Sequence, residues 1–262
     1  MKWIIVVFIG VANLWGGIMT KEVTYSLDGT SFRGFLAWDG SMTGARPGIL
    51  VFHEWWGLND FARLQAKKLA EMGYIAFAPD MYGNGDTALN QAMAAKMSSE
   101  VRGTPRMRER ARLALQTLLS QSSVDSTRIA AIGFCFGGTA ALELAYTGAS
   151  INGVVAFHAG LSSPAEDELK GSRTKFLILH GADDPYAPLD TINRFQAALR
   201  HAGVDWRMIY FSNAVHGFMN SANGTDNSRG VAYNPAAAAR AWEYMRLFFR
   251  EVLPPASENA GK

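Results

Sequence analysis

Residues 128–145, RIAAIGFCFGGTAALELA, decide the fold of this chain. The apolar run from Ile129 to Phe134 is too short for a helix and predicts a strand, whereas residues 139–146 carry helix formers at helical spacing. Cys135 lies on the turn between them, in the pattern Gly-x-Cys-x-Gly. The same pattern with serine at its centre is a nucleophile elbow, a sharp strand-to-helix turn that exposes the reactive side chain. Glycine is needed on both sides because the neighbouring backbone must approach this strained turn closely.

Two interpretations of Cys135 stay open from this stretch alone. A thiol at the N-terminus of a helix faces unpaired N–H groups and the positive end of the helix dipole, which favour the reactive thiolate. The alternative is a buried cysteine that serves only as a small apolar residue. Because it is the only cysteine in the chain, an intrachain disulfide and a Cys-x-x-Cys redox or zinc site are excluded.

Strand and helix patterns alternate on both sides of this stretch. Residues 22–38 predict a hairpin that turns at Asp28-Gly29 and lies at an edge. We expect an α/β fold, an open and mostly parallel sheet with helices on both faces, and ligands at the carboxyl ends of its strands. Residues 86–103 fit either a helix or a mobile cover, and the sequence assigns them no role. The further strands expected are 48–52, 74–78, 153–158, 175–180 and 206–211, and the further helices are 60–72, 106–120, 189–201 and 235–252.

The composition describes a globular chain. Hydrophobic residues make up 48% of the 262 positions and charged residues 18%, without a repeat or a low-complexity stretch. The formal net charge of +2 is spread along the chain and forms no basic cluster, so nothing predicts a nucleic-acid partner. No stable membrane partner is expected either.

The ends of the chain predict the domain boundaries. Residues 1–20 are a candidate leader, since the apolar run from Trp3 to Val11 resembles the start of a signal peptide although its cleavage signal is poor. Residues 21–253 are expected to form a single domain, and residues 254–262 a flexible tail. A cytoplasmic location is favoured, with Met19 as another candidate start. Export to the periplasm or outside the cell remains the alternative, as does a membrane anchor.

Three residues suited to nucleophilic catalysis each follow a predicted strand. Cys135, Asp184 and His216 come in the order nucleophile, acid and base, 49 and 32 residues apart. These gaps leave room for the strand and helix units that separate such residues in an open α/β sheet. Asp183 is the alternative acid. Among the other histidines, His158 is the one that could line the same pocket.

Four motifs resemble the dienelactone hydrolase family, carboxymethylenebutenolidase-like members of the α/β-hydrolases. The resemblance runs from Val23 to Val252, and it implies a hydrolase of lactones or esters that needs no metal or organic cofactor and forms an acyl-thioenzyme. It also implies a Cys-His-Asp triad, with the glutamate of the first motif handling the proton of the resting thiol; a strand-end carboxylate in solvent is the alternative for that residue. The motifs are His53-Glu54-Trp55-Trp56-Gly57, Gly133-Phe134-Cys135-Phe136-Gly137-Gly138, Asp184-Pro185-Tyr186-Ala187-Pro188 and His216-Gly217-Phe218.

Further site residues follow from this arrangement. The oxyanion hole is expected to use the backbone N–H groups of Phe136 and Trp55. An aromatic substrate pocket is predicted from Trp55, Trp56, Tyr82, Phe134, Tyr186 and Phe218.

The activity and the substrate have alternatives. The preferred hypothesis is a cysteine-dependent hydrolase of small lactones or carboxylic esters; the others are cleavage of a thioester or peptide and a non-catalytic binding protein. The family members that act on anionic lactones bind the carboxylate through arginines, and no arginine occupies the expected positions here. A preference for neutral substrates is therefore predicted, unless Arg229 or an arginine of segment 102–112 folds over the pocket.

Overall fold

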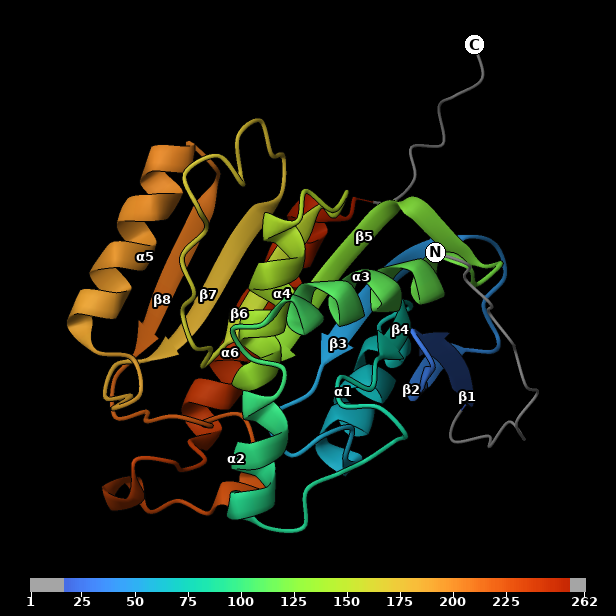
Figure 1. The fold of residues 1–262 in the computed structure, drawn as a ribbon. Helices are drawn as coiled ribbons and strands as arrows, with labels where there is room; N and C mark the ends of the chain where they lie inside the picture. The colour runs from blue at the N-terminus through green and yellow to red at the C-terminus, as the bar shows by residue number, and fades with distance from the viewer. Residues whose placement is uncertain (1–16, 255–262) are drawn as a thin grey trace.

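A computed structural model describes residues 17–254 of the chain. Eight strands form one sheet in the order β1-β2-β4-β3-β5-β6-β7-β8 (Figure 1). The strands are β1 (Ile18–Leu27), β2 (Thr30–Asp39), β3 (Arg46–Phe52), β4 (Ile75–Ala78), β5 (Val124–Phe134), β6 (Gly153–Phe157), β7 (Lys175–Gly181) and β8 (Trp206–Phe211). The helices are α1 (Asp60–Glu71), α2 (Gln91–Ser99), α3 (Pro105–Leu119), α4 (Phe136–Tyr146), α5 (Leu189–Ala202) and α6 (Pro235–Val252), with 3₁₀ turns η1 (Ser221–Asn223) and η2 (Asn227–Arg229).

The strands of the sheet run in the predicted directions, and the predicted hairpin lies at its edge. β1 and β2 form the expected antiparallel hairpin at one edge, while β4, β3, β5, β6, β7 and β8 run parallel. β1 begins at Ile18, inside the segment assigned to a leader, because its residues pair with the end of β2 at Asp39. Residues 1–16 of that segment and residues 255–262 of the expected tail lie outside the described residues. The open, mostly parallel sheet is confirmed.

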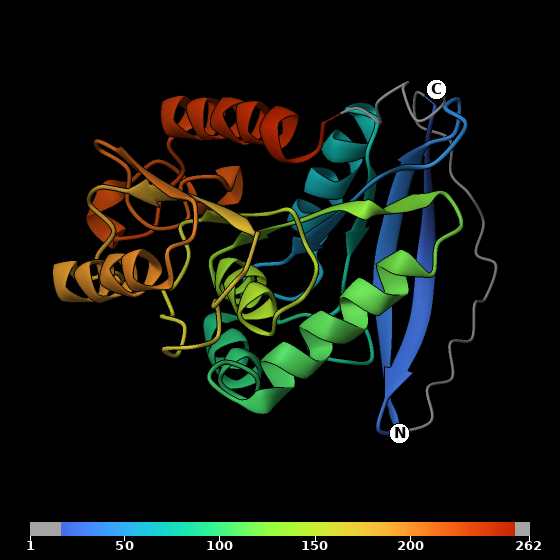
Figure 2. The same cartoon turned by 90° about the horizontal axis from the view of Figure 1, so that it is seen from above.

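Helices cover both faces of the sheet, as predicted (Figure 2). Alternate residues of β3 show the reason: Leu50 belongs to the core cluster on the face that carries α3, α4 and α5, whereas Ile49 and Val51 belong to the cluster on the face that carries α1 and α6. Strands buried on both faces need apolar residues at every position, which explains their continuous apolar runs. Among the described residues, no helix is both long and apolar enough to cross a membrane.

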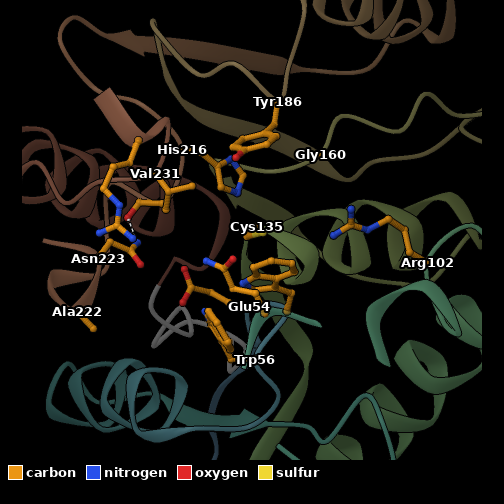
Figure 3. A pocket seen from close by; sticks show the side chains of 14 residues that line it. Glu54, Trp56, Arg102, Cys135, Gly160, Tyr186, His216, Ala222, Asn223 and Val231 are labelled. Carbon is orange, nitrogen blue, oxygen red and sulfur yellow. Dashed lines mark hydrogen bonds between the residues drawn. The ribbon is translucent and has the colours of Figure 1, made fainter. Parts of the chain in front are cut away.

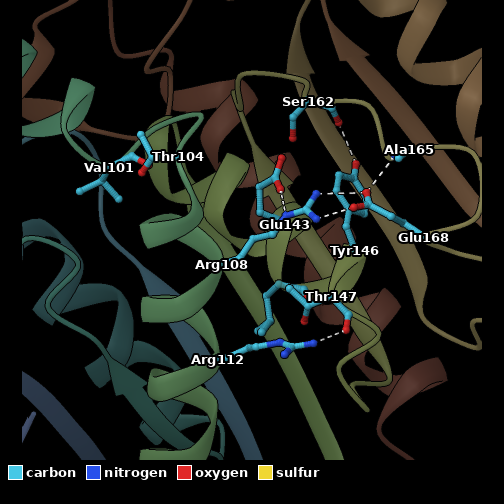
Figure 4. Close-up of polar contacts among 11 residues, drawn as sticks. Val101, Thr104, Arg108, Arg112, Glu143, Tyr146, Thr147, Ser162, Ala165 and Glu168 are labelled. Carbon is cyan, nitrogen blue, oxygen red and sulfur yellow. Dashed lines mark hydrogen bonds and ion pairs between the residues drawn. The ribbon is translucent and has the colours of Figure 1, made fainter. Parts of the chain in front are cut away.

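Ion pairs and hydrogen bonds join α3, α4 and the segment after β6 on one face (Figure 4). Arg108 of α3 binds the carboxylates of Glu143 and Glu168, at 2.6 Å for the Glu143 pair. Nearby, the Tyr146 hydroxyl donates to the Ser162 carbonyl at 2.8 Å. These contacts fix the long connection between β6 and β7 against the helices.

Candidate active site

A cavity of about 470 Å³ opens at the carboxyl edge of the sheet. In Figure 3, Tyr186 and His216 lie on one side of Cys135, and Glu54 and Trp56 lie on the other. The segment whose role the sequence left open supplies one wall, since α2 and the turn after it contribute Gln91 and Arg102. The full lining is Glu54, Trp55, Trp56, Gln91, Arg102, Cys135, Gly160, Tyr186, His216, Gly217, Ala222, Asn223, Arg229 and Val231.

Cys135 occupies the sharp turn between β5 and α4. Its backbone has φ 54° and ψ −116°, a conformation that residues with a side chain rarely adopt. The turn is held because the Cys135 N–H donates to the Phe157 carbonyl at 3.0 Å. A Cβ on Gly133 would collide with the Gly137 backbone, and a Cβ on Gly137 would collide with the end of β3. Glycine at both positions therefore allows β5 and α4 to meet at this angle.

The imidazole of His216 is oriented by Asp184. His216 Nδ1 lies 2.8 Å from Asp184 Oδ2, while the Tyr186 N–H donates to Asp184 Oδ1 at 2.9 Å. Since a carboxylate accepts, Nδ1 carries the proton, and Nε2 is the ring nitrogen that is left to interact with Cys135. Asp184 is only 7% exposed, whereas Asp183 is exposed, so the structure brings Asp184 and not its neighbour to the histidine.

The protonation of His216 reflects its neighbours. Burial is the largest influence and lowers the pKa of His216, but the negative charge of Cys135 and hydrogen bonds with Asp184 and Cys135 outweigh it and raise the pKa to about 10. An imidazolium is therefore favoured whenever Cys135 carries a negative charge.

The loop that carries His216 is closed by a distant part of the chain. The His216 N–H donates to the Gly230 carbonyl at 3.2 Å, and the Ala232 N–H donates to the His216 carbonyl at 3.1 Å. This bridge brings Arg229 and Val231 to the cavity wall, although they follow the histidine by 13 and 15 residues.

Glu54 is a buried carboxyl group that also lines the cavity. It is 4% exposed, and its Oε2 accepts a hydrogen bond of 2.7 Å from Asn220 Nδ2. Burial raises the pKa of Glu54 to about 7, although the Asn220 hydrogen bond and the nearby His216 lower it. The alternative of a strand-end carboxylate in solvent is wrong. Sequence reasoning missed Asn220, whose only signal was its position four residues after His216.

Two backbone N–H groups near Cys135 have no acceptor among residues 17–254. They belong to Phe136, at the first position of α4, and Trp55, after β3. These are the two groups that the sequence analysis assigned to an oxyanion hole.

The predicted aromatic pocket is partly wrong. Trp55, Trp56 and Tyr186 line the cavity, but Tyr82, Phe134 and Phe218 do not. Phe134 and Phe218 are fully buried in the core cluster that includes residues of α1 and α6. Phe134 lies there because the side chain before Cys135 on β5 points to the opposite face of the sheet. Tyr82 packs beside the loop after β3 and donates its hydroxyl proton to the Trp55 carbonyl at 2.9 Å.

His158 lies beneath His216 and not in the cavity wall. It is fully buried, and its ring meets that of His216 at 5.2 Å in a T-shaped contact. Burial, followed by the charge of His216, holds the pKa of His158 well below its usual value, so this ring is neutral.

Arginines reach the pocket from outside the two positions at which the sequence lacks them. Arg102 and Arg229 both line the cavity, as the alternative allowed. Both side chains are exposed, and within the described residues neither guanidinium forms a hydrogen bond or an ion pair. Arg102 instead lies over the Phe136 ring, at 5.7 Å from its centroid.

Alignments with similar proteins of known family extend over nearly the whole chain. A structure titled "m3DLH" is 40% identical with a TM-score of 0.85, covering 91% of this chain and 100% of its own. A dienelactone hydrolase-like promiscuous phosphotriesterase from metagenomic libraries is 37% identical with a TM-score of 0.85, covering 90% and 99%. An Aquifex aeolicus protein provisionally named carboxymethylenebutenolidase is 29% identical, covering 90% and 100%.

The family assignment follows from a direct match. Residues 32–253 match the Dienelactone hydrolase family, over nearly the same range as the sequence motifs resemble it. The fold and these relatives agree with that match. The chain therefore belongs to the dienelactone hydrolase family and is a hydrolase of ester or lactone bonds.

Proposed function

We propose that the chain hydrolyses a small lactone or carboxylic ester through an acyl-thioenzyme on Cys135. The observation that carries the proposal is the cavity in which the half-buried thiol, at a strained strand-to-helix turn, shares one wall with a histidine already hydrogen-bonded to a buried aspartate. Asp184 fixes the tautomer of His216 and stabilises its charged form. An intact set of three such residues argues against a non-catalytic binding protein.

The reaction has two halves. His216 takes the Cys135 proton, the thiolate attacks the acyl carbon, the C–O bond to the leaving group breaks, and His216 gives that oxygen the proton. His216 then takes a proton from water, whose oxygen attacks the thioester and releases the acid, and His216 returns the proton to the Cys135 thiolate. The N–H groups of Phe136 and Trp55 stabilise the oxyanion that forms in each half.

Glu54 disfavours a negative charge on Cys135 before substrate binds. A buried carboxylate beside Cys135 opposes a second negative charge and helps to keep the thiol protonated and resistant to oxidation. The raised pKa of Glu54 lets this group hold or release a proton near neutral pH.

The nucleophile is tested by replacing its sulfur. Cys135→Ala is expected to lower kcat/KM by at least about 10³-fold on a panel of esters and lactones, because no thioester can form. A phosphotriester belongs on the panel because a relative is a promiscuous phosphotriesterase. Circular dichroism controls for folding. A folded Cys135→Ala protein with full activity would contradict the proposal.

The assignment of Asp184 as the residue that orients His216 is tested against Asp183. Asp184→Asn should lower kcat by about 10⁴-fold, since the amide no longer selects the tautomer of His216. Asp183→Asn is the matched control, removing the same charge one position away on an exposed side chain. Steady-state kinetics of both variants measure the difference, and a larger loss for the Asp183 variant would overturn the assignment.

The preference for a charged or neutral substrate is tested by replacing an arginine of the cavity wall. The unpaired guanidinium groups of Arg102 and Arg229 favour an anionic substrate, because a guanidinium binds a carboxylate with two parallel hydrogen bonds. Arg229→Ala should lower kcat/KM for a carboxylated lactone by about tenfold or more and change that for its methyl ester little. Arg240→Ala, on the exposed side of α6, is the charge-matched control. Equal losses on both substrates would rule out a carboxylate contact.

A further inference from the structure

The peptide between Glu54 and Trp55 supplies the less obvious of the two oxyanion donors. The Phe136 N–H is aimed by the start of α4, but Trp55 lies in a loop outside any helix or strand. A loop donor needs separate support, because a donor that is displaced or rotated stabilises the oxyanion poorly. We propose that His53 and Tyr82 are positioning residues that hold the Trp55 N–H toward the oxyanion, an inference that rests on the proposed function.

The geometry of a trans peptide links the direction of the Trp55 N–H to that of the Glu54 carbonyl. In a planar trans peptide the carbonyl of one residue and the N–H of the next point in opposite directions. No cis peptide occurs among the described residues. Any contact that fixes the Glu54 carbonyl therefore fixes the direction of the Trp55 N–H. That carbonyl accepts from His53 Nδ1 at 2.5 Å and, at the longer distance of 3.3 Å, from the Gly57 N–H.

The tautomer of His53 follows from its second contact. His53 Nε2 lies 3.2 Å from the Met81 backbone nitrogen, which can only donate. Nε2 is therefore the acceptor, and Nδ1 carries the proton that binds the Glu54 carbonyl. The ring is fully buried, which lowers the pKa of His53 and keeps it neutral. Both ring nitrogens are thus used within the protein.

Tyr82 holds the next peptide of the same loop. Its hydroxyl donates to the Trp55 carbonyl at 2.9 Å, so the peptides on both sides of Trp55 are restrained. The Tyr82 ring packs on His53 at 5.0 Å and on Phe136 at 5.4 Å, and His53 stacks on Phe136 at 5.9 Å. The three rings connect the residues that carry the two donors.

The segment that carries Tyr82 and Met81 is itself fixed. It follows β4 and turns around the Asp80 carboxylate, while the Arg110 guanidinium donates to the carbonyls of Met81 and Tyr82 at 2.6 and 3.1 Å. The N–H groups bound by Asp80 are those of Arg33, Tyr82, Gly83 and Gly85. Neither His53 nor Tyr82 lines the cavity, so both act through Trp55 and not on the substrate.

Paired variants test this role with two readouts. His53→Leu should lower kcat for an ester by about 10²-fold with little change in KM, because an oxyanion donor acts in the transition state. His53→Gln should restore most of kcat, since its amide supplies both a donor group and an acceptor atom. Tyr82→Phe should lower kcat by about tenfold. Tyr146→Phe is the matched control, because it loses a similar hydroxyl-to-carbonyl bond away from Trp55 and should keep wild-type kcat.

Alkylation of Cys135 by iodoacetamide separates this role from general damage. That reaction displaces iodide from a saturated carbon and forms no oxyanion, so its rate should be unchanged in His53→Leu and Tyr82→Phe. Alkylation rates that fall in parallel with kcat would overturn the proposal, as would wild-type kcat in both variants or a Gln variant no better than Leu. If alkylation of the wild-type protein leaves ester hydrolysis intact, the proposed function itself fails.

Discussion

The arrangement of the candidate active site depends on one strained backbone position. Cys135 keeps a positive φ that costs of order 1–3 kcal/mol, and the packing of β5 and α4 through glycines holds it there. The turn has two results. It places the thiol at the N-terminus of a helix, and it leaves the Phe136 N–H beside the thiol without an acceptor in the part of the chain that the structure describes. A residue with a Cβ at Gly133 or Gly137 would force these elements apart.

The parallel sheet brings the remaining groups to the same edge. Glu54, Asp184 and His216 all follow the carboxyl ends of strands, and the two carboxyl groups meet different surroundings. Asp184 accepts a backbone N–H and the histidine N–H, which suits a fixed orienting anion. Glu54 is buried with one amide donor, and its pKa rises to about 7. One carboxyl group therefore orients the imidazole that the proposed mechanism uses as a base, while the other can exchange a proton.

The sequence predicted what depends on local pattern. Residues 128–145 encode their own turn, and polar residues at strand ends can be expected to lie together because parallel strands end at one edge. It did not predict what depends on distant packing. Arg229 reaches the cavity only because residues 230–232 pair with His216, and Phe134 leaves it because alternate strand residues face opposite sides. The hydrogen bond from the Tyr82 hydroxyl to the Trp55 carbonyl likewise joins loops 27 residues apart.

The central claim is that Cys135 carries the acyl group during turnover. Intact-mass analysis after mixing with a slowly hydrolysed ester tests it most directly, with peptide mapping to locate the adduct. The account predicts one acyl group per chain, on the peptide containing Cys135, that disappears as hydrolysis is completed. Continued hydrolysis with the acyl group on another residue would contradict it.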